Sequence, residues 1–235
     1  MRRPPSAKPL ERYKREAAER AAAHVESGMI LGLGTGSTAI FAIRWIADRL
    51  RDGSLDGITG VATSIAVAAE ARRLGIPLPA EMPPAIDLTI DGADEVDPEL
   101  NLVKGGGGAL LREKIVAQAS RRVIVVADQS KLSAQLGSLA VLPLEVVPFG
   151  WRAQLGFVES LGAAATVRRA PGGRPVRTDQ GNVILDCAFG PIDRPAELAA
   201  RLAGRAGIVE HGLFLGLATD LIVSGPDGVR HERRP

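Results

Sequence analysis

The chain has 235 residues, 46% of them hydrophobic, which is enough for one large domain or for a domain with a small companion. No apolar run reaches the roughly 18–20 residues of a membrane span. The basic N-terminus is not followed by the apolar segment of a signal peptide. We therefore expect a soluble, cytoplasmic protein without a membrane partner. The net charge is only +2, charges of both signs are interspersed and aromatic residues make up 3%, which argues against nucleic acid as a partner. The single cysteine, Cys187, excludes an internal disulfide and a thiolate cluster.

Predicted strands and helices alternate along roughly the first 138 residues. Amphipathic spacing predicts an N-terminal helix over 10–27, and the run at 122–127 is typical of a strand that is buried on both faces. The other predicted elements, in chain order, are a strand at 29–33, a helix at 37–50, a strand at 57–62, a helix at 64–74, a strand at 85–90 and a helix at 109–119. This alternation predicts an α/β fold with a doubly wound, mostly parallel, Rossmann-like sheet.

After about residue 138 the pattern changes, because prolines interrupt the chain. The predicted elements there are antiparallel strands at 141–147 and 182–188 and a helix at 194–203, with 213–217 and 221–223 able to rejoin the first sheet. We therefore expect a catalytic Rossmann-like domain formed by 1–138 with 207–235, and a second, smaller α+β domain at 139–206.

A glycine-rich loop at 32–38, with the sequence Gly-Leu-Gly-Thr-Gly-Ser-Thr, lies between a predicted strand and a predicted helix. Glycines let the backbone approach an anion, and the N-terminus of a helix directs amide donors toward it. The loop has neither the ending of a nucleotide P-loop nor a dinucleotide fingerprint. Its hydroxyl groups favour a small phosphate monoester, although glycines of a tight turn before a helix cap would look the same.

An acidic turn, Asp91-Gly92-Ala93-Asp94-Glu95, follows another predicted strand. Ligands of open parallel sheets bind at that edge. If the three carboxylates are crowded, some of their pKa values should rise, which suits proton transfer or contacts with sugar hydroxyls. A magnesium site and a plain polar turn are the alternatives.

A glycine segment extends from Lys104 through Gly105, Gly106, Gly107 and Gly108 and leads into a predicted helix that carries Glu113. Four consecutive glycines lose much backbone entropy on ordering, and close approach of a ligand would offset that cost. Three of the five lysines of the chain lie within 28 residues, at Lys104, Lys114 and Lys131, which singles out this stretch. Read alone, Glu113 could equally belong to a solvated helix face.

Together these segments resemble the A-type ribose-5-phosphate isomerases. The resemblance rests on four motifs in the expected order: the Gly-Thr-Gly-Ser-Thr loop, the Asp-Gly-Ala-Asp-Glu turn, the Lys-Gly-Gly-Gly segment with its following Arg-Glu-Lys, and the Asp-Gln-Ser-Lys at 128–131. It extends from about residue 10 to residue 228. It implies an aldose–ketose isomerase of the non-oxidative pentose phosphate pathway, a homodimer whose only ligand is a small sugar phosphate, with no cofactor and no metal.

The resemblance also implies residue roles. The phosphate would be held by Thr35, Gly36, Ser37 and Thr38, with Lys14 as a weaker match beside them. The residues that would line the sugar-binding site are Asp91, Gly92, Ala93, Asp94, Lys104, Gly105, Gly106 and Gly107. Lys131 would also contact the substrate. Glu113 would move the proton, Asp91 with Lys104 would help to open the ring, and Asp94 would position Glu113 or a hydroxyl.

Three features differ from that pattern or stay outside it. The arginine-rich leader at 1–9 is extra and expected to be disordered, and the segment 215–217 departs from the family sequence. The three histidines, His24, His211 and His231, lie outside every motif, so we expect them to be structural or exposed.

Two other functions remain as alternatives. A non-catalytic sugar-phosphate sensor would normally carry a helix-turn-helix, for which too few residues precede Met29, and it would not need Glu113. An amino-sugar phosphate deaminase or a lactonase would normally rely on a catalytic histidine, which the motifs lack.

Overall fold

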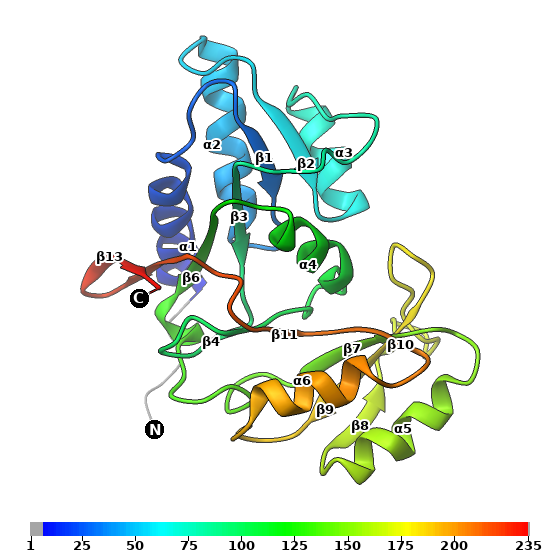
Figure 1. Cartoon of the computed structure of the whole chain (residues 1–235). Coiled ribbons are helices and arrows are strands. Elements are labelled where there is room, and N and C mark those ends of the chain that lie inside the picture. The colour runs from blue at the N-terminus through cyan, green and yellow to red at the C-terminus, as the bar shows by residue number, and fades with distance from the viewer. Residues whose placement is uncertain (1–6, 235) are drawn as a thin grey trace. The chain divides into compact units, whose positions relative to one another are not determined.

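The structure, a computed structural model, describes residues 7–234 (Figure 1). The chain forms two compact units. The first contains the residues up to Ala93, Ile115–Lys131 and the residues from Leu217 onward, and the second contains Asp94–Lys114 and Leu132–Gly216.

The first unit is built on a six-stranded sheet in the order β13-β12-β6-β3-β1-β2. Its strands are β1 (Ile30–Leu33), β2 (Thr59–Ala62), β3 (Leu88–Gly92), β6 (Val123–Asp128), β12 (Asp220–Gly225) and β13 (Gly228–Arg233). Neighbouring strands are parallel except β12 and β13, which form an antiparallel hairpin. The prediction of a mostly parallel α/β sheet is confirmed.

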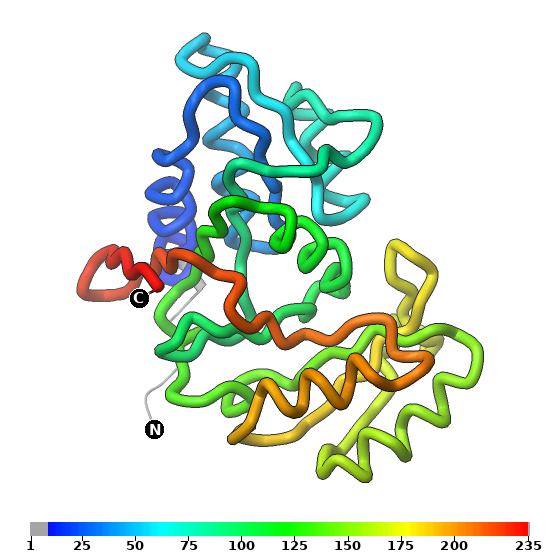
Figure 2. Tube along the Cα trace, in the orientation of Figure 1, coloured from blue at the N-terminus to red at the C-terminus, as the bar shows by residue number. Residues whose placement is uncertain are grey.

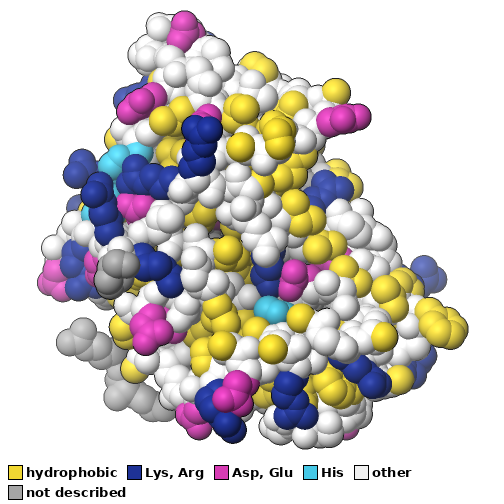
Figure 3. All heavy atoms as spheres, viewed as in Figure 1, with side chains coloured by type: hydrophobic (Ala, Val, Ile, Leu, Met, Phe, Trp, Pro, Cys, Tyr) yellow, Lys and Arg dark blue, Asp and Glu magenta, His cyan; other side chains and the backbone are white. Residues whose placement is uncertain are grey.

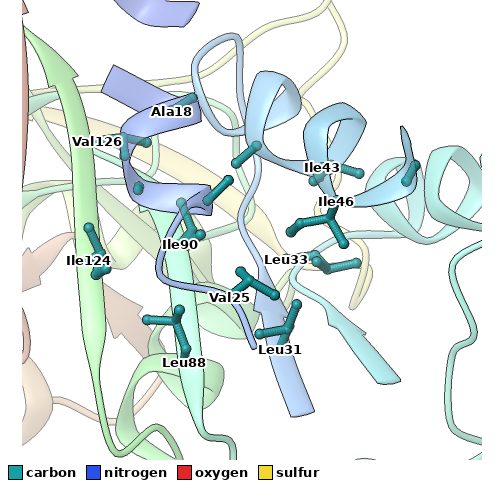
Figure 4. Packing of buried hydrophobic residues seen from close by; sticks show 14 of the residues in the cluster. Ala18, Val25, Leu31, Leu33, Ile43, Ile46, Leu88, Ile90, Ile124 and Val126 are labelled. Carbon is teal, nitrogen blue, oxygen red and sulfur yellow. The ribbon is translucent and has the colours of Figure 1, made fainter. Parts of the chain in front are cut away.

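Helices cover both faces of this sheet. The helices with residues in this unit are α1 (Ala7–Ala22), α2 (Ala39–Asp52), α3 (Ile65–Arg73) and the second half of α4 (Leu110–Gln118). Leu31 and Leu33 of β1 pack with residues of α1 and α2 in the main core (Figure 4). Gly32, between them, faces the other side, where a Cβ atom would collide with Thr89 and with Val116 of α4. The alternation of side chains along β1 therefore lets helices pack on both faces.

The order of the parallel strands creates a switch point between β1 and β3. From β1 the chain moves outward to β2 and then crosses back over β1 to reach β3, and Leu33 of β1 is aligned with Ile90 of β3. Both strands therefore end at the same edge, with the loop after Leu33 beside the end of β3. Such a position is where ligands bind in open α/β sheets.

The first and last elements of the first unit lie side by side (Figure 2). Helix α1 packs against β6 and β12, and Ser224 of β12 donates a hydrogen bond to Glu16 of α1. The strand expected at 221–223 is part of β12 and does rejoin the first sheet. Disorder was expected for the leader 1–9, but residues 7–9 belong to α1, and residues 1–6 lie outside the described residues.

The second unit contains a four-stranded antiparallel sheet in the order β10-β7-β9-β8. Its elements are β7 (Leu142–Val146), α5 (Trp151–Ser160), β8 (Ala164–Val167), β9 (Val183–Ala188), α6 (Pro195–Ala203) and β10 (Ile208–His211). Val158 of α5 and Leu202 of α6 are buried in one cluster with Leu144 and Leu185 of the sheet. The prediction of a separate α+β part is confirmed at the level of fold class.

A small three-stranded sheet in the order β11-β5-β4 also belongs to the second unit. It consists of β4 (Glu95–Val96), β5 (Leu102–Val103) and β11 (Leu213–Phe214). Segment 213–217 therefore does not rejoin the first sheet as expected, because Leu213 and Phe214 pair with Val103 and Leu102. The second unit also contains 94–114, 132–138 and 207–216, which were expected in the first domain. Strands of two residues are too short to produce a periodic sequence pattern.

The described part of the chain contains no helix that is both long and apolar enough to cross a membrane. On the face shown in Figure 3, acidic and basic side chains lie next to one another at several places.

Candidate active site

The loop after β1 forms an amide-rich turn at the start of α2. Gly36 has φ +123°, a conformation that favours glycine, and Thr38 is the residue before the first turn of α2. Gly34 lies so close to Asp91 that a Cβ atom would be 2.5 Å from the Asp91 Cα atom. The N–H of Thr35 donates to Asp91 Oδ1 over 3.1 Å, which fixes the loop against the end of β3.

The hydroxyl groups of this loop have different environments. The Thr35 hydroxyl lies 2.8 Å from that of Thr63 and 2.9 Å from that of Ser64, so it contributes to the packing of the loop. Ser37 is exposed, and Lys14 Nζ donates to its Oγ atom over 2.9 Å. Thr38 makes no side-chain cap bond to α2. A lysine, two hydroxyl groups and the N-terminus of a helix are thus brought together, which is a suitable arrangement for a small anion.

Asp91 is buried at the end of β3. Its Oδ1 atom also accepts the N–H of Gly92, over 2.7 Å. The half-buried residues Gly92 and Ala93 follow it, and Ala93 is the last residue of the first of the three segments that form the first unit. Asp91 therefore holds both the glycine loop and its own turn.

Lys131 lies at the same edge of the first sheet. It ends the short 3-10 helix Gln129–Lys131 that follows β6, and its side chain is partly buried. Asp128 fixes this turn, because its Oδ1 atom accepts both the N–H and the hydroxyl of Ser130. Lys131 therefore lies just beyond the carboxyl end of β6, and its contact with a substrate stays a prediction.

In the second unit, the glycine segment folds against Asp94. Gly106 donates its N–H to Asp94 Oδ2 over 2.7 Å, and a Cβ atom on Gly106 would lie only 2.6 Å from Asp94 Oδ1. Gly105 has φ +107°, and the N–H of Gly108 donates to its carbonyl, which closes a turn before α4. Glycine is therefore required at 105 for its conformation and at 106 for the close approach of the carboxylate.

Glu113 is buried and forms an ion pair with Lys104. Lys104 Nζ donates to Glu113 Oε1 over 3.1 Å, and both side chains are 5% exposed. Lys104 follows β5 and donates its N–H to the carbonyl of Gly212, while Glu113 occupies the first turn of α4, where a carboxylate is favourable. Glu113 therefore does not belong to a solvated helix face. A buried carboxylate beside a cation and a run of amides is suited to moving a proton.

Glu95, the third acid of the acidic turn, has a structural role. It is fully buried, and its two oxygens accept four backbone N–H groups of residues 137–140 over 2.9–3.1 Å. The expectation that this carboxylate belongs to a crowded proton-handling cluster is therefore wrong for Glu95. Within the described residues, no three histidine, cysteine, aspartate or glutamate side chains are arranged to hold a metal ion.

A second buried group was not recognised from the sequence. Lys114, the residue after Glu113, donates to Glu210 Oε1 over 2.6 Å and to the carbonyl of His211 over 2.7 Å, and lies 3.2 Å from His211 Nδ1. Its Nζ atom is 4.9 Å from the centre of the Phe214 ring. Burial lowers the pKa of Lys114, and burial together with the Lys114 charge lowers the pKa of His211 to about 4. His211 is thus a neutral structural acceptor. The clustering of lysines at 104–131 pointed to Lys114, but nothing in the sequence pointed to its partners Glu210 and His211.

The comparisons with known proteins agree with this geometry. The family model of ribose 5-phosphate isomerase A (phosphoriboisomerase A) matches residues 59–228. The ribose-5-phosphate isomerase A of Chloroflexus aurantiacus is 60% identical over 94% of this chain and 93% of its own length.

Solved structures match over nearly the whole chain. A D-ribose-5-phosphate isomerase in complex with phospho-erythronic acid has a TM-score of 0.93 and 37% identity, covering 96% of this chain and 99% of its own. The ribose 5-phosphate isomerase of Plasmodium falciparum has a TM-score of 0.92 and 36% identity, covering 95% and 99%. With its glycine loop, acidic turn and buried Glu113 in the expected elements, the chain belongs to the ribose-5-phosphate isomerase A family.

Proposed function

We propose that the chain interconverts D-ribose 5-phosphate and D-ribulose 5-phosphate through an enediolate and that Glu113 carries the proton. The observation that supports this role is the buried position of Glu113 at the start of α4, 3.1 Å from Lys104. Lys104 precedes the four glycines in the chain and Glu113 follows them, and both residues lie in the second unit. A carboxylate held in this way is shielded from water and can act on a carbon acid.

The proposed chemical step transfers a proton between two adjacent carbons. Glu113 takes the proton from C2 of the open-chain aldose, and the electron pair of the C–H bond forms the C1–C2 double bond while the carbonyl oxygen on C1 gains negative charge. A proton passes from the C2 hydroxyl to the C1 oxygen, and Glu113 then returns its proton to C1. Lys104 and backbone amides of the glycine segment would stabilise the developing charge.

Two aspartates would prepare the substrate for this step. Asp91, with Lys104, would assist opening of the furanose ring, since ring opening needs a proton removed from the anomeric hydroxyl. Asp94, whose Oδ2 atom is fixed by the N–H of Gly106, would orient a sugar hydroxyl or Glu113. Both roles require a carboxylate with a set orientation, which the hydrogen bonds from Thr35 to Asp91 and from Gly106 to Asp94 supply.

The phosphate would be bound by the loop 34–38 with Lys14. Ser37, Thr38 and the loop amides would act as donors, and the Lys14 ammonium already lies 2.9 Å from the Ser37 hydroxyl. Binding energy from a group remote from the reacting carbons can orient the substrate. The related enzyme in complex with phospho-erythronic acid supports a ligand of this class, in which a phosphorylated chain ends in a planar anion.

We further propose a cytoplasmic homodimer that acts in the non-oxidative pentose phosphate pathway, with a Rossmann-like domain and a smaller α+β domain. These proposals follow from family membership. Light scattering of the purified protein at micromolar concentration tests the dimer. A mass of about twice 24.6 kDa is expected, and the monomer mass would reject the dimer.

The direct test of the activity mixes purified protein with ribose 5-phosphate and follows ketose formation without added metal. Ribulose 5-phosphate should form. The two sugars should reach the same equilibrium ratio whether the reaction starts from ribose 5-phosphate or from ribulose 5-phosphate. Binding of ribose 5-phosphate with no ketose formed would identify a sensor instead.

A further inference from the structure

Arg168 connects the glycine segment to the antiparallel sheet of the second unit. Its Nη1 atom donates to the carbonyl oxygens of both Gly105 and Gly106, over 2.9 Å each. These contacts join residues that are more than sixty positions apart in the chain. Nothing in the motifs of the sequence singles out Arg168.

Arg168 is itself held firmly. Its Nε and Nη2 atoms form a two-pronged ion pair with the carboxylate of Asp186 on β9, with 2.9 Å between Nε and Oδ2. Its backbone N–H donates to the carbonyl of Ile184, and its side chain is only 18% exposed. The guanidinium is therefore a rigid part of the sheet, with the planar fork geometry that a lysine does not have.

The orientation of two peptide groups follows from these contacts. In a trans peptide the C=O and the following N–H point in opposite directions, and the peptide bonds of the described residues are all trans. Because the carbonyls of Gly105 and Gly106 both turn toward Arg168, the N–H groups of Gly106 and Gly107 turn away from it. The Gly106 N–H accordingly meets Asp94 Oδ2 at 2.7 Å.

We propose that Arg168, clamped by Asp186, is a positioning residue that fixes the peptide groups between Gly105 and Gly107, so that the Gly106 amide anchors Asp94 and the Gly107 amide is held ready as a donor for the oxygen that becomes negative during isomerisation. The inference rests on the proposed function. Without the guanidinium, a glycine segment has many backbone conformations open to it, and the amides would have to be ordered in each turnover. Pre-oriented donors need no such reorganisation.

The proposal predicts a specific kinetic pattern for Arg168→Met. The value of kcat should fall roughly 10–100-fold, while KM changes by less than about threefold because the phosphate contacts are intact. The inhibition constant of phospho-erythronic acid should rise with the fall in kcat. The matched control is Arg169→Met, since the neighbouring Arg169 is exposed and its Nη1 atom donates to the Gly173 carbonyl of a surface turn; its kinetics should be within twofold of wild type.

Two further variants separate positioning from a general loss of structure. In Arg168→Ala, millimolar guanidinium should restore part of kcat, whereas equal concentrations of sodium or ammonium should not. Asp186→Asn should lower kcat in the wild type but have little added effect in the Arg168→Met background, because Asp186 acts through Arg168.

The inference is overturned if Arg168→Met keeps kcat within threefold of wild type. It is also overturned if kcat falls only in proportion to the folded fraction measured by circular dichroism and guanidinium restores nothing. The proposed function fails separately, if the wild-type protein forms no ketose from ribose 5-phosphate, and the role of Glu113 fails if Glu113→Gln retains wild-type turnover.

Discussion

The ion pair between Lys104 and Glu113 predicts a large cost for removing its cation. Both side chains are 5% exposed and their charged atoms are 3.1 Å apart. At an effective dielectric constant of about 20, this separation corresponds to roughly 5 kcal/mol of attraction, and breaking a buried pair by removing one partner costs about 3–5 kcal/mol. Lys104→Met keeps the length of the side chain, so we expect this loss without a cavity. For a chain of this size it corresponds to a decrease in Tm of about 6–20 °C.

Equilibrium urea denaturation gives the free energy of unfolding for the test. In the double variant Lys104→Met, Glu113→Gln no buried carboxylate remains at this position, so most of the lost stability should return. The control is Arg51→Met, which breaks the exposed pair with Asp48 and should change stability little, because solvent screens such pairs. If Lys104→Met is as stable as the control, or if the second change adds to the loss, the buried pair does not have the assigned energy.

Three further changes test other parts of the site. Ser37→Ala and Thr38→Ala should chiefly raise KM, since phosphate contacts exist in the ground and transition states alike; unchanged kinetics in both would mean that the phosphate binds elsewhere. Exhaustive EDTA treatment should leave activity intact, and activity that returns only with a divalent ion would assign a metal to the acidic turn. His211 takes up a proton near pH 6.5 when unfolded but only near pH 4 when folded, so its contribution to stability is complete above pH 6.5 and is lost as the pH falls toward 4. His211→Asn, which retains an acceptor in place of Nδ1, should flatten that part of the pH–stability curve, and an unchanged slope would exclude His211 as its source.

Local sequence patterns were sufficient to locate the glycine-rich loop 34–38 and the main sheet. The loop 34–38 is flanked directly by the strand and the helix that position it, so its geometry follows from neighbouring residues. Asp91 could be placed because a strand of buried apolar residues ends there. The alternation of strands and helices along the chain was enough to predict a mostly parallel sheet.

Contacts between distant segments could not be predicted in the same way. The amides that bind Glu95 come from residues 137–140, and the partner of Lys114 is His211, 97 residues away. The burial of Glu113 depends on Lys104 and on how the short strands β5 and β11 pair. The family resemblance therefore identified Glu113 as a candidate, and only the fold distinguished it from a solvated helix residue.

The same limit explains why Arg168 was not recognised. It lies in an arginine pair of a chain that is rich in arginine, so its residue type carried no signal. Its proposed role depends on hydrogen bonds to the carbonyls of Gly105 and Gly106. The Arg168 side chain can form these bonds only once β8 has paired with β9.

The most direct test of the account is the kinetics of Glu113→Gln. The substitution keeps the shape of the side chain and removes its basicity, so kcat should fall about 10²–10⁴-fold or more. Binding of ribose 5-phosphate should persist, because the loop 34–38 and Lys14 are unchanged. Exchange of the C2 proton with solvent should decrease in parallel with turnover, since both require the same base.

A glutamate with only a structural role gives the opposite result. Its replacement by glutamine would lower stability and leave the rate per folded molecule intact. The measurement is therefore turnover and C2-proton exchange of Glu113→Gln, each corrected for the folded fraction. A loss of at least two orders of magnitude in both is predicted, and turnover within a few-fold of wild type would show that another group, with Asp91 and Asp94 as the first candidates, accepts the proton.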